Sequence, residues 1–201
     1  MYLPRPFVLA SLPFLTYCAS PPNIGQLATD LPGLNRYITT HNAAGKAVIQ
    51  SSAPAQWLPL ANNTAAFDVV YTTSTFPVNM KNDADILAHS QLYSKGPVPL
   101  ALPGGTVCRI IDLAPGSVPL MHRTQSLDYG VVLEGDVEMQ LDGGEKKSLG
   151  RGDVAVMRGT EHAWKNTGKG WCRIFFVLVG AEKVDIGGRL LEEDVPPIAG
   201  L

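Results

Sequence analysis

The pattern of hydrophobic and polar positions changes near the middle of the chain. From Thr106 onward, short apolar or alternating segments are separated by turns rich in Gly, Asp and Asn. Such segments, about four to eight residues long and bounded by turn formers, are typical of β-strands. We expect strands over residues 107–113, 128–133, 137–141, 147–149, 154–157, 162–166 and 171–179. This series of short strands predicts an all-β domain built as a sandwich or barrel.

The first half of the chain shows a weaker pattern. The expected elements are a β-hairpin over residues 36–52 with its turn at 42–45, a loop over 56–66, a strand over 67–75 and a helical turn over 83–89. His41 falls at the hairpin turn, where a solvated side chain is the rule. His89 carries no signal beyond its residue type, so we expect it at the surface.

Composition narrows the class of protein. The chain has 201 residues, enough for one domain with a core, and its 20 glycines and 16 prolines are spread along it. A net charge of −2 gives no electrostatic signal for nucleic acid. The sequence contains no apolar run long enough for an integral membrane span.

The N-terminus and the cysteines allow alternatives. Arg5 precedes an apolar segment, residues 7–17, and small residues follow at 18–20. This order resembles a signal peptide and favours the secretory pathway, although Pro13 interrupts the apolar run. In the alternative interpretation, residues 1–20 are a capping segment that packs on the barrel. Removal of this segment would leave Cys108 and Cys172, either bridged or, as we favour, as two small buried hydrophobes.

Polar residues recur at fixed spacings between Gly116 and Asn166. The first group runs Gly116, His122, Thr124, Asp128 and Gly135, and the second runs Gly152-Asp153, His162 and Asn166. Alternate side chains of a strand share a face, so His122 and Thr124 are expected to point one way and Arg123 the other. By the same alternation, Asp128, Gly130 and Val132 share one face, as do His162, Trp164 and Asn166.

These spacings resemble the two signature motifs of the cupin family. The strings at 121–130, 133–135 and 158–166, with the hairpin at 40–47, are similar to small single-domain cupins of fungal and bacterial pathways. The resemblance implies a cupin fold, a double-stranded β-helix or jelly-roll barrel, with an N-terminal hairpin arm and short helical segments. It divides the chain into residues 1–20, then arm and loops at 21–100, the barrel core at 101–182 and a C-terminal tail at 183–201.

The resemblance also implies that His122, Thr124, Asp128 and His162 meet inside the barrel. The family usually places three histidines and one glutamate there, whereas this chain has Thr124 for one histidine and Asp128 for the glutamate. Met157-Arg158 stands where the family usually has a proline. Two imidazoles and a carboxylate still match a site for Fe, Zn or Mn, so His122, Asp128 and His162 are candidate metal ligands.

A metal-free site is the other interpretation. His122 and His162 would act as general acid and base, with Asp128 orienting one imidazole. Thr124 and Arg158 would hold substrate oxygens, and Trp164 would line the pocket. Arg109 and Arg173 either pair with Asp112 or line the interior.

The resemblance favours an enzyme of small-molecule, polyketide-like secondary metabolism. The expected chemistry is that of a lyase or cyclase: dehydration, decarboxylation, or formation of a reactive intermediate followed by cycloaddition, as in a Diels–Alderase. The alternatives are a metal-dependent oxygenase or hydrolase and a non-catalytic binding barrel. The resemblance also implies a homodimer.

Overall fold

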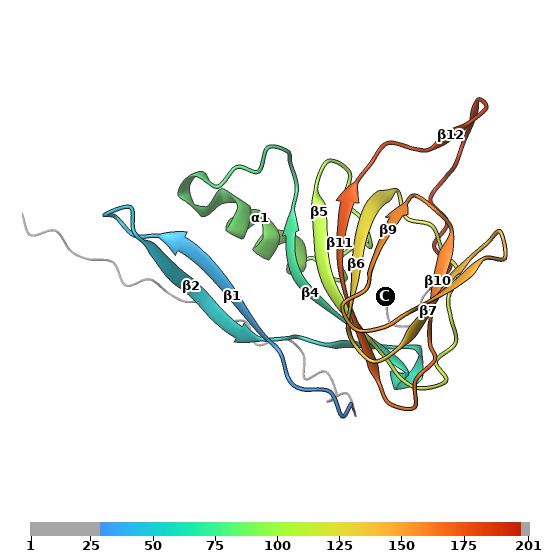
Figure 1. Ribbon diagram of the computed structural model, residues 1–201. Coiled ribbons are helices and arrows are strands. Elements are labelled where there is room, and N and C mark those ends of the chain that lie inside the picture. Colours follow the sequence, from blue (N-terminus) through green and yellow to red (C-terminus); the bar gives the residue numbers. More distant parts are fainter. Residues whose placement is uncertain (1–28, 198–201) are drawn as a thin grey trace, which may run out of the picture.

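The computed structural model describes residues 29–197, and they form a barrel with a projecting arm (Figure 1). The strands are β1 (Asn35–His41), β2 (Ala47–Pro54), β3 (Leu58–Leu60), β4 (Ala65–Thr73), β5 (Thr106–Leu113), β6 (Ser126–Glu134), β7 (Val137–Leu141), β8 (Lys146–Leu149), β9 (Val154–Arg158), β10 (His162–Asn166), β11 (Cys172–Gly180), β12 (Asp185–Ile186) and β13 (Arg189–Leu190). The helices are the short η1 (Ala61–Asn63) and η2 (Lys81–Asp83) and the α-helix α1 (Ala84–Tyr93). The expected all-β class is confirmed.

Two antiparallel sheets form the barrel. The larger has the strand order β3-β4-β5-β11-β6-β9, and the smaller has the order β10-β7-β8. Because β11 lies between β5 and β6, strands distant in the sequence are neighbours in the sheet. The expected strands of the second half are all present, with ends shifted by one or two residues.

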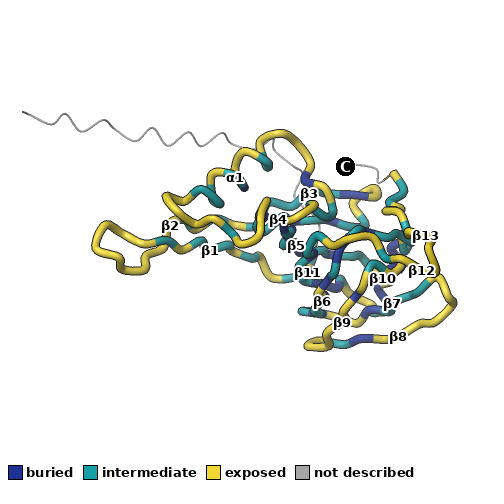
Figure 2. The backbone as a smooth tube through the Cα atoms, turned by 90° about the horizontal axis from the view of Figure 1, so that it is seen from above, coloured by how far each residue is buried: buried dark blue, intermediate teal, exposed yellow. Residues whose placement is uncertain are grey.

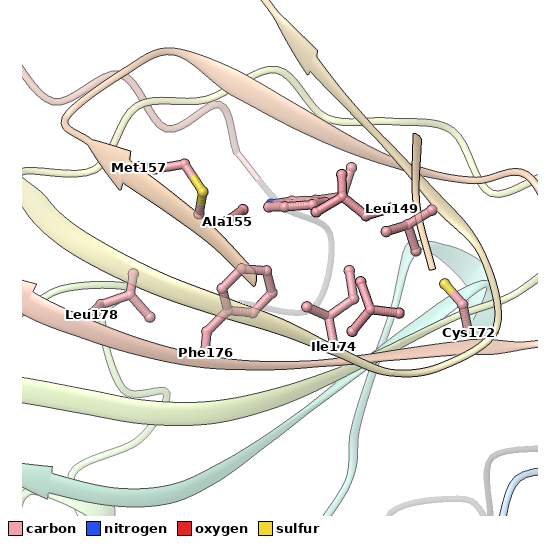
Figure 3. Packing of buried hydrophobic residues seen from close by; sticks show 10 residues of the cluster. Leu149, Ala155, Met157, Cys172, Ile174, Phe176 and Leu178 are labelled. Atoms are coloured by element: carbon pink, nitrogen blue, oxygen red, sulfur yellow. The ribbon is translucent and has the colours of Figure 1, made fainter. Parts of the chain in front are cut away.

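The hydrophobic core lies between these two sheets (Figure 3). Ile174, Phe176 and Leu178 alternate along β11, and Trp164 contributes from the facing sheet. Gly130 on β6 allows this packing, because a Cβ there would lie 2.6 Å from the Phe176 ring. The predicted shared face of β6 is confirmed by the burial of its alternate residues.

The arm is the hairpin β1–β2, which projects away from the barrel and is largely exposed (Figures 1 and 2). Its turn is held by Asn42, whose Oδ1 accepts hydrogen bonds from the N–H groups of Ala44 and Lys46, both at 3.0 Å. Thr40 donates to Asp83 at 2.7 Å, and Arg36 donates to the carbonyl of Val70 at 3.1 Å. The arm is thereby tied to η2 and to β4.

The structure differs from the sequence-based expectations at His89 and in the strands that build the barrel. The prediction that His89 lies at the surface is wrong, because its side chain is buried where α1 meets β4. The expected loop at 56–66 contains β3, and β3 and β4 belong to the larger sheet, so the barrel takes strands from outside residues 101–182. Cys108 and Cys172 are free thiols. The interpretation of residues 1–20 lies outside the described residues.

Arg173 and Asp112 form the buried ion pair of the sheet. Nε and Nη2 of Arg173 donate to the two carboxylate oxygens of Asp112, each at 2.6 Å. This geometry is the bidentate contact that makes Arg–carboxylate pairs strong.

No helix among residues 29–197 is long and apolar enough to cross a membrane.

Candidate functional site

A cavity of about 290 Å³ opens between the two sheets. Strands β4, β5, β6, β10 and β11 contribute to its wall, together with the segment 118–122. Its apolar lining comprises Leu60, Ala61, Ala65, Phe67, Leu100, Ile111, Leu113, Val118, Pro119, Leu120, Trp164, Phe176, Leu178 and Pro197. The polar lining is small and chemically distinctive: Arg109, His122, Asp128 and His162. A mostly apolar cavity with a few convergent polar groups is the usual form of a small-molecule site.

The two histidines are fixed against each other by the backbone. The N–H of each donates to the carbonyl of the other at 2.9 Å, so residues 122 and 162 form an isolated β-bridge. Their ring centroids are 4.6 Å apart, with the planes inclined by 48°. One bridge therefore brings together two imidazoles that are 40 residues apart in the sequence.

Both imidazoles are held in the same tautomer. Nδ1 of His122 lies 3.0 Å from the carbonyl oxygen of Leu120, and Nδ1 of His162 lies 2.9 Å from that of Thr160. A carbonyl oxygen only accepts, so Nδ1 must carry the proton in each ring. The Nε2 atom of each neutral ring therefore keeps its lone pair and can act as a base.

Burial makes both rings easier to deprotonate. It lowers the pKa of His162 and, together with the neighbouring His162, the pKa of His122 from the ordinary 6.5. The negative charge of Asp128 acts in the opposite direction on His122 alone. The two histidines therefore differ in their surroundings: the charges of Asp128 and Arg109 act on His122 in opposite directions, whereas only the hydrogen bond to Thr160 opposes the lowering of the pKa of His162.

Asp128 is held by hydroxyl groups. Ser126 donates to Oδ1, and Thr124 donates to Oδ2 at 3.3 Å, while the two hydroxyls are 2.8 Å apart. Burial raises the pKa of Asp128, and these hydrogen bonds oppose the rise. The expectation that Asp128 orients an imidazole by a hydrogen bond is not met, because backbone carbonyls do so, and Asp128 acts on His122 through its charge.

The predicted site residues divide into three groups. His122, Asp128, His162 and Trp164 all line the cavity, as predicted. Thr124 is buried behind Asp128 and reaches the cavity only through that carboxylate. We expected His122 and Thr124 to point one way and Arg123 the other. This prediction is wrong, because residues 122–124 form no continuous strand and Thr124 lines a second hollow.

Arg158 also lies away from the cavity. It is exposed on β9 and lines the second hollow, which has a volume of about 180 Å³ and includes Lys183 and Glu192. The expected role of Arg158 in holding substrate oxygens in the barrel mouth is therefore corrected. Arg109 lines the cavity, which is one of the two interpretations that the sequence offered for it.

The expected metal ligands do not form a ligand set. Within residues 29–197, no three His, Cys, Asp or Glu side chains are grouped so that they could hold a metal ion. The two imidazoles present their Nε2 atoms, but the oxygens of Asp128 are engaged by Ser126 and Thr124. Within the described residues the structure therefore shows no grouped two-histidine, one-carboxylate set, and a metal at these residues stays a prediction.

Comparison with known proteins relates the chain to fungal biosynthetic proteins. The family model described as a cupin domain matches residues 109–179. The chain is 46% identical over 160 residues to "Phomopsin biosynthesis cluster protein C'" of Diaporthe leptostromiformis, covering 78% of this chain and 84% of that protein. It is 37% identical over 169 residues to "Oryzines biosynthesis cluster protein J" of Aspergillus oryzae, covering 83% and 93%. It is 39% identical over 162 residues to "Cupin-domain-containing oxidoreductase virC" of Hypocrea virens, covering 77% and 81%.

Proposed function

This chain belongs to the cupin family, and we propose that it is a biosynthetic enzyme that performs acid–base chemistry on a small molecule in the barrel cavity. The reaction class is that of a lyase or cyclase: loss of water or of carbon dioxide, giving a reactive intermediate that can close a ring. One observation carries the proposal: two imidazoles share an apolar cavity, each with Nδ1 fixed on a carbonyl and Nε2 left as a base. The relatives from biosynthesis clusters support a role in secondary metabolism.

Dehydration illustrates how the pair would act. Nε2 of His162 takes a proton from the substrate, and the electron pair of that bond forms a double bond as the adjacent C–O bond breaks. The imidazolium of His122 protonates the departing hydroxyl, which leaves as water. The proton has then moved from His122 to His162, and exchange with solvent restores the pair after release. Asp128 supports His122 as the acid in this scheme because its charge stabilises the protonated form from which the step starts.

The cavity walls contribute by excluding water. Trp164 and Phe176 meet edge-on with centroids 5.4 Å apart, which gives an aromatic wall next to His162. An apolar wall protects a reactive intermediate from hydration and holds its reacting atoms close together. Ring closure needs only this confinement once the intermediate has formed.

Replacement of the proposed base tests the function. The His162→Gln protein is incubated with the metabolite that accumulates in a host lacking this gene, and the loss of water or carbon dioxide is followed by mass spectrometry. We expect turnover to fall by about a hundredfold or more, as is typical when a general base is removed. The His41→Gln protein is the matched control, because His41 is exposed on the arm. Unchanged turnover by the His162→Gln protein would remove His162 from the mechanism.

A redox reaction is the second candidate, because relatives such as virC are named cupin-domain-containing oxidoreductases. Metal analysis of protein purified without chelator, followed by turnover in EDTA, separates the two candidates. Stoichiometric metal together with EDTA-sensitive turnover favours the oxidoreductase, and activity that survives EDTA favours acid–base chemistry. An unmodified ligand in native mass spectra, with no product from any fraction, would indicate a binding barrel.

We also propose that the protein is a homodimer. The arm projects from the barrel and exposes Tyr37 and Ile49, at 62% and 65% of their surface. Apolar side chains on a projecting hairpin are suited to pairing with a second copy. Light scattering after size exclusion tests this, and the double variant Tyr37→Ser, Ile49→Ser is expected to shift the protein toward monomer. A monomeric mass for the unmodified protein would refute the proposal.

A further inference from the structure

We propose that Arg109 is the anion-binding residue of the cavity, and that the substrate carries a carboxylate beside an apolar body. The inference deepens the proposed function, since it takes the cavity as the substrate site. It assigns a role to a residue outside the His122, His162 and Asp128 group, and it names a substrate class.

The guanidinium of Arg109 is buried yet incompletely paired. Only 2% of the residue is exposed. Nη2 donates to the carbonyls of Pro99 at 2.7 Å and Leu100 at 3.5 Å, whereas the buried Nε has no hydrogen-bond partner. The group lies 5.5 Å from the centre of the Phe67 ring. A guanidinium has five N–H donors in a fixed fork, so several remain for a ligand in the cavity that it lines.

Arg173 shows what a compensated arginine looks like in the same sheet. Its Nε and Nη2 both contact the carboxylate of Asp112 at 2.6 Å. Among residues 29–197, no carboxylate lies in salt-bridge contact with Arg109, and the nearby Asp128 is hydrogen-bonded by two hydroxyls instead. Burial lowers the pKa of Arg109 only to about 10, so its charge persists at neutral pH.

A buried charge without a directly paired carboxylate is costly even though the charge of Asp128 offsets part of the burial, and a ligand anion relieves that cost. Arginine is suited to planar anions because its fork can make two parallel hydrogen bonds to a carboxylate. Among residues 29–197, the lining contains no lysine and no second arginine, while Asp128 adds a carboxyl group. These features favour one singly charged carboxylate over a phosphate, which would need more donors.

The assignment also selects among the proposed reactions. A carboxylate held by Arg109 is stabilised in the ground state, which opposes its loss as carbon dioxide. The same contact holds the carboxylate at Arg109, so that the histidine pair acts on another part of the substrate. Dehydration with the carboxylate retained is therefore the reaction that Arg109 favours.

Two isosteric probes test the inference: 2-naphthoate and its neutral analogue 2-naphthamide, titrated by calorimetry at neutral pH. We expect the unmodified protein to bind the naphthoate at least about tenfold more tightly, as for one charge-assisted hydrogen-bonded contact. The Arg109→Met protein should lose this preference, and the Arg109→Lys protein should keep part of it. The Arg151→Met protein is the matched control, because Arg151 is an exposed arginine at a barrel turn, and it should bind like the unmodified protein.

Equal affinity of the unmodified protein for the two probes, or no binding of either, overturns the inference, and this comparison needs no variant. A preference that survives in a folded Arg109→Met protein, checked by circular dichroism, overturns it as well. The His162→Gln protein separates this test from that of the function, because it should keep the naphthoate preference while losing turnover. If it keeps both, the acid–base proposal fails and the anion site stands.

Discussion

Replacement of the buried His89 by glutamine should change how the stability of the protein depends on pH. Nε2 of His89 lies 3.3 Å from Nη1 of Arg36, and Nδ1 lies 3.0 Å from the hydroxyl of Thr72. Arginine only donates, so Nε2 must be unprotonated, and protonation would place two positive groups in contact. Burial first, and then the charge of Arg36, lowers the pKa of His89 from 6.5 to about 4.

The sign of the effect follows from this lowered pKa. The unfolded chain binds the proton more tightly than the folded protein, so the contribution of His89 is complete above pH 6.5 and is lost as the pH falls toward 4. Each tenfold difference in proton affinity corresponds to about 1.4 kcal/mol. The free energy of unfolding should therefore lose about 2 kcal/mol by about pH 5 and about 3 kcal/mol by about pH 4 through this residue.

Urea unfolding followed by tryptophan fluorescence, at several pH values between about 4 and 7.5, measures this effect. Other buried groups titrate in the same range, including Asp68, whose pKa is raised by burial, and the cavity histidines. Subtraction of the His89→Gln curve from that of the unmodified protein isolates the one histidine. Tyr71, Tyr93 and Asp85 surround the same group and are present in both proteins. Two curves with the same slope would refute the assignment of a neutral His89 against Arg36.

Three further results are expected. If proton transfer by the histidine pair limits turnover, kcat/KM should peak below pH 6.5 and decline toward pH 8. The decline is expected because the lowered pKa of His122 leaves it without its proton at higher pH. A flat profile from pH 5 to 8 would contradict the pair as acid and base. Gly130→Ala should lower the free energy of unfolding by about 1–3 kcal/mol, since its Cβ would lie 2.6 Å from Phe176, and an unchanged melting temperature would contradict this packing. Asp112→Asn should lower the free energy of unfolding by about 3–5 kcal/mol, because it leaves the charge of Arg173 buried and unpaired. Chemical denaturation measures this loss, and a loss below about 1 kcal/mol would show that the ion pair is dispensable.

The pattern of polar and apolar residues predicted most of the barrel strands, because that pattern lies within each strand itself. The alternation along β6 and β10 predicted which residues share a face with Asp128 and with His162, and glycine-containing turns marked the strand ends. The cupin resemblance added the step that alternation cannot make, which is the meeting of these strands in one barrel. Asp128, His162 and Trp164 therefore line the cavity as expected, and their roles in catalysis or binding stay predictions.

The sequence misplaced residues whose position depends on contacts between distant segments. Thr124 lies between an isolated bridge and the start of β6, so alternation did not govern its direction. His89 is buried because α1 packs on β4, and nothing in its neighbours along the chain records that contact. Arg158 is exposed on β9, so its nearness in sequence to His162 did not imply nearness to the cavity.

By itself the sequence determined the strands, because side-chain alternation is a local property, and its resemblance to cupins indicated the two cavity histidines and the carboxyl group of Asp128. Only the tertiary structure decided how these groups are used. Carbonyls at positions 120 and 160 fix the imidazole tautomers, and hydroxyls rather than imidazoles hold Asp128. The structure also decided which buried arginine is paired: Arg173 meets Asp112 directly, whereas Arg109 lines the cavity and its Nε has no hydrogen-bond partner. Hydrogen-bond partners are set by distances between strands, and the strand pairing that sets those distances is a property of the folded chain.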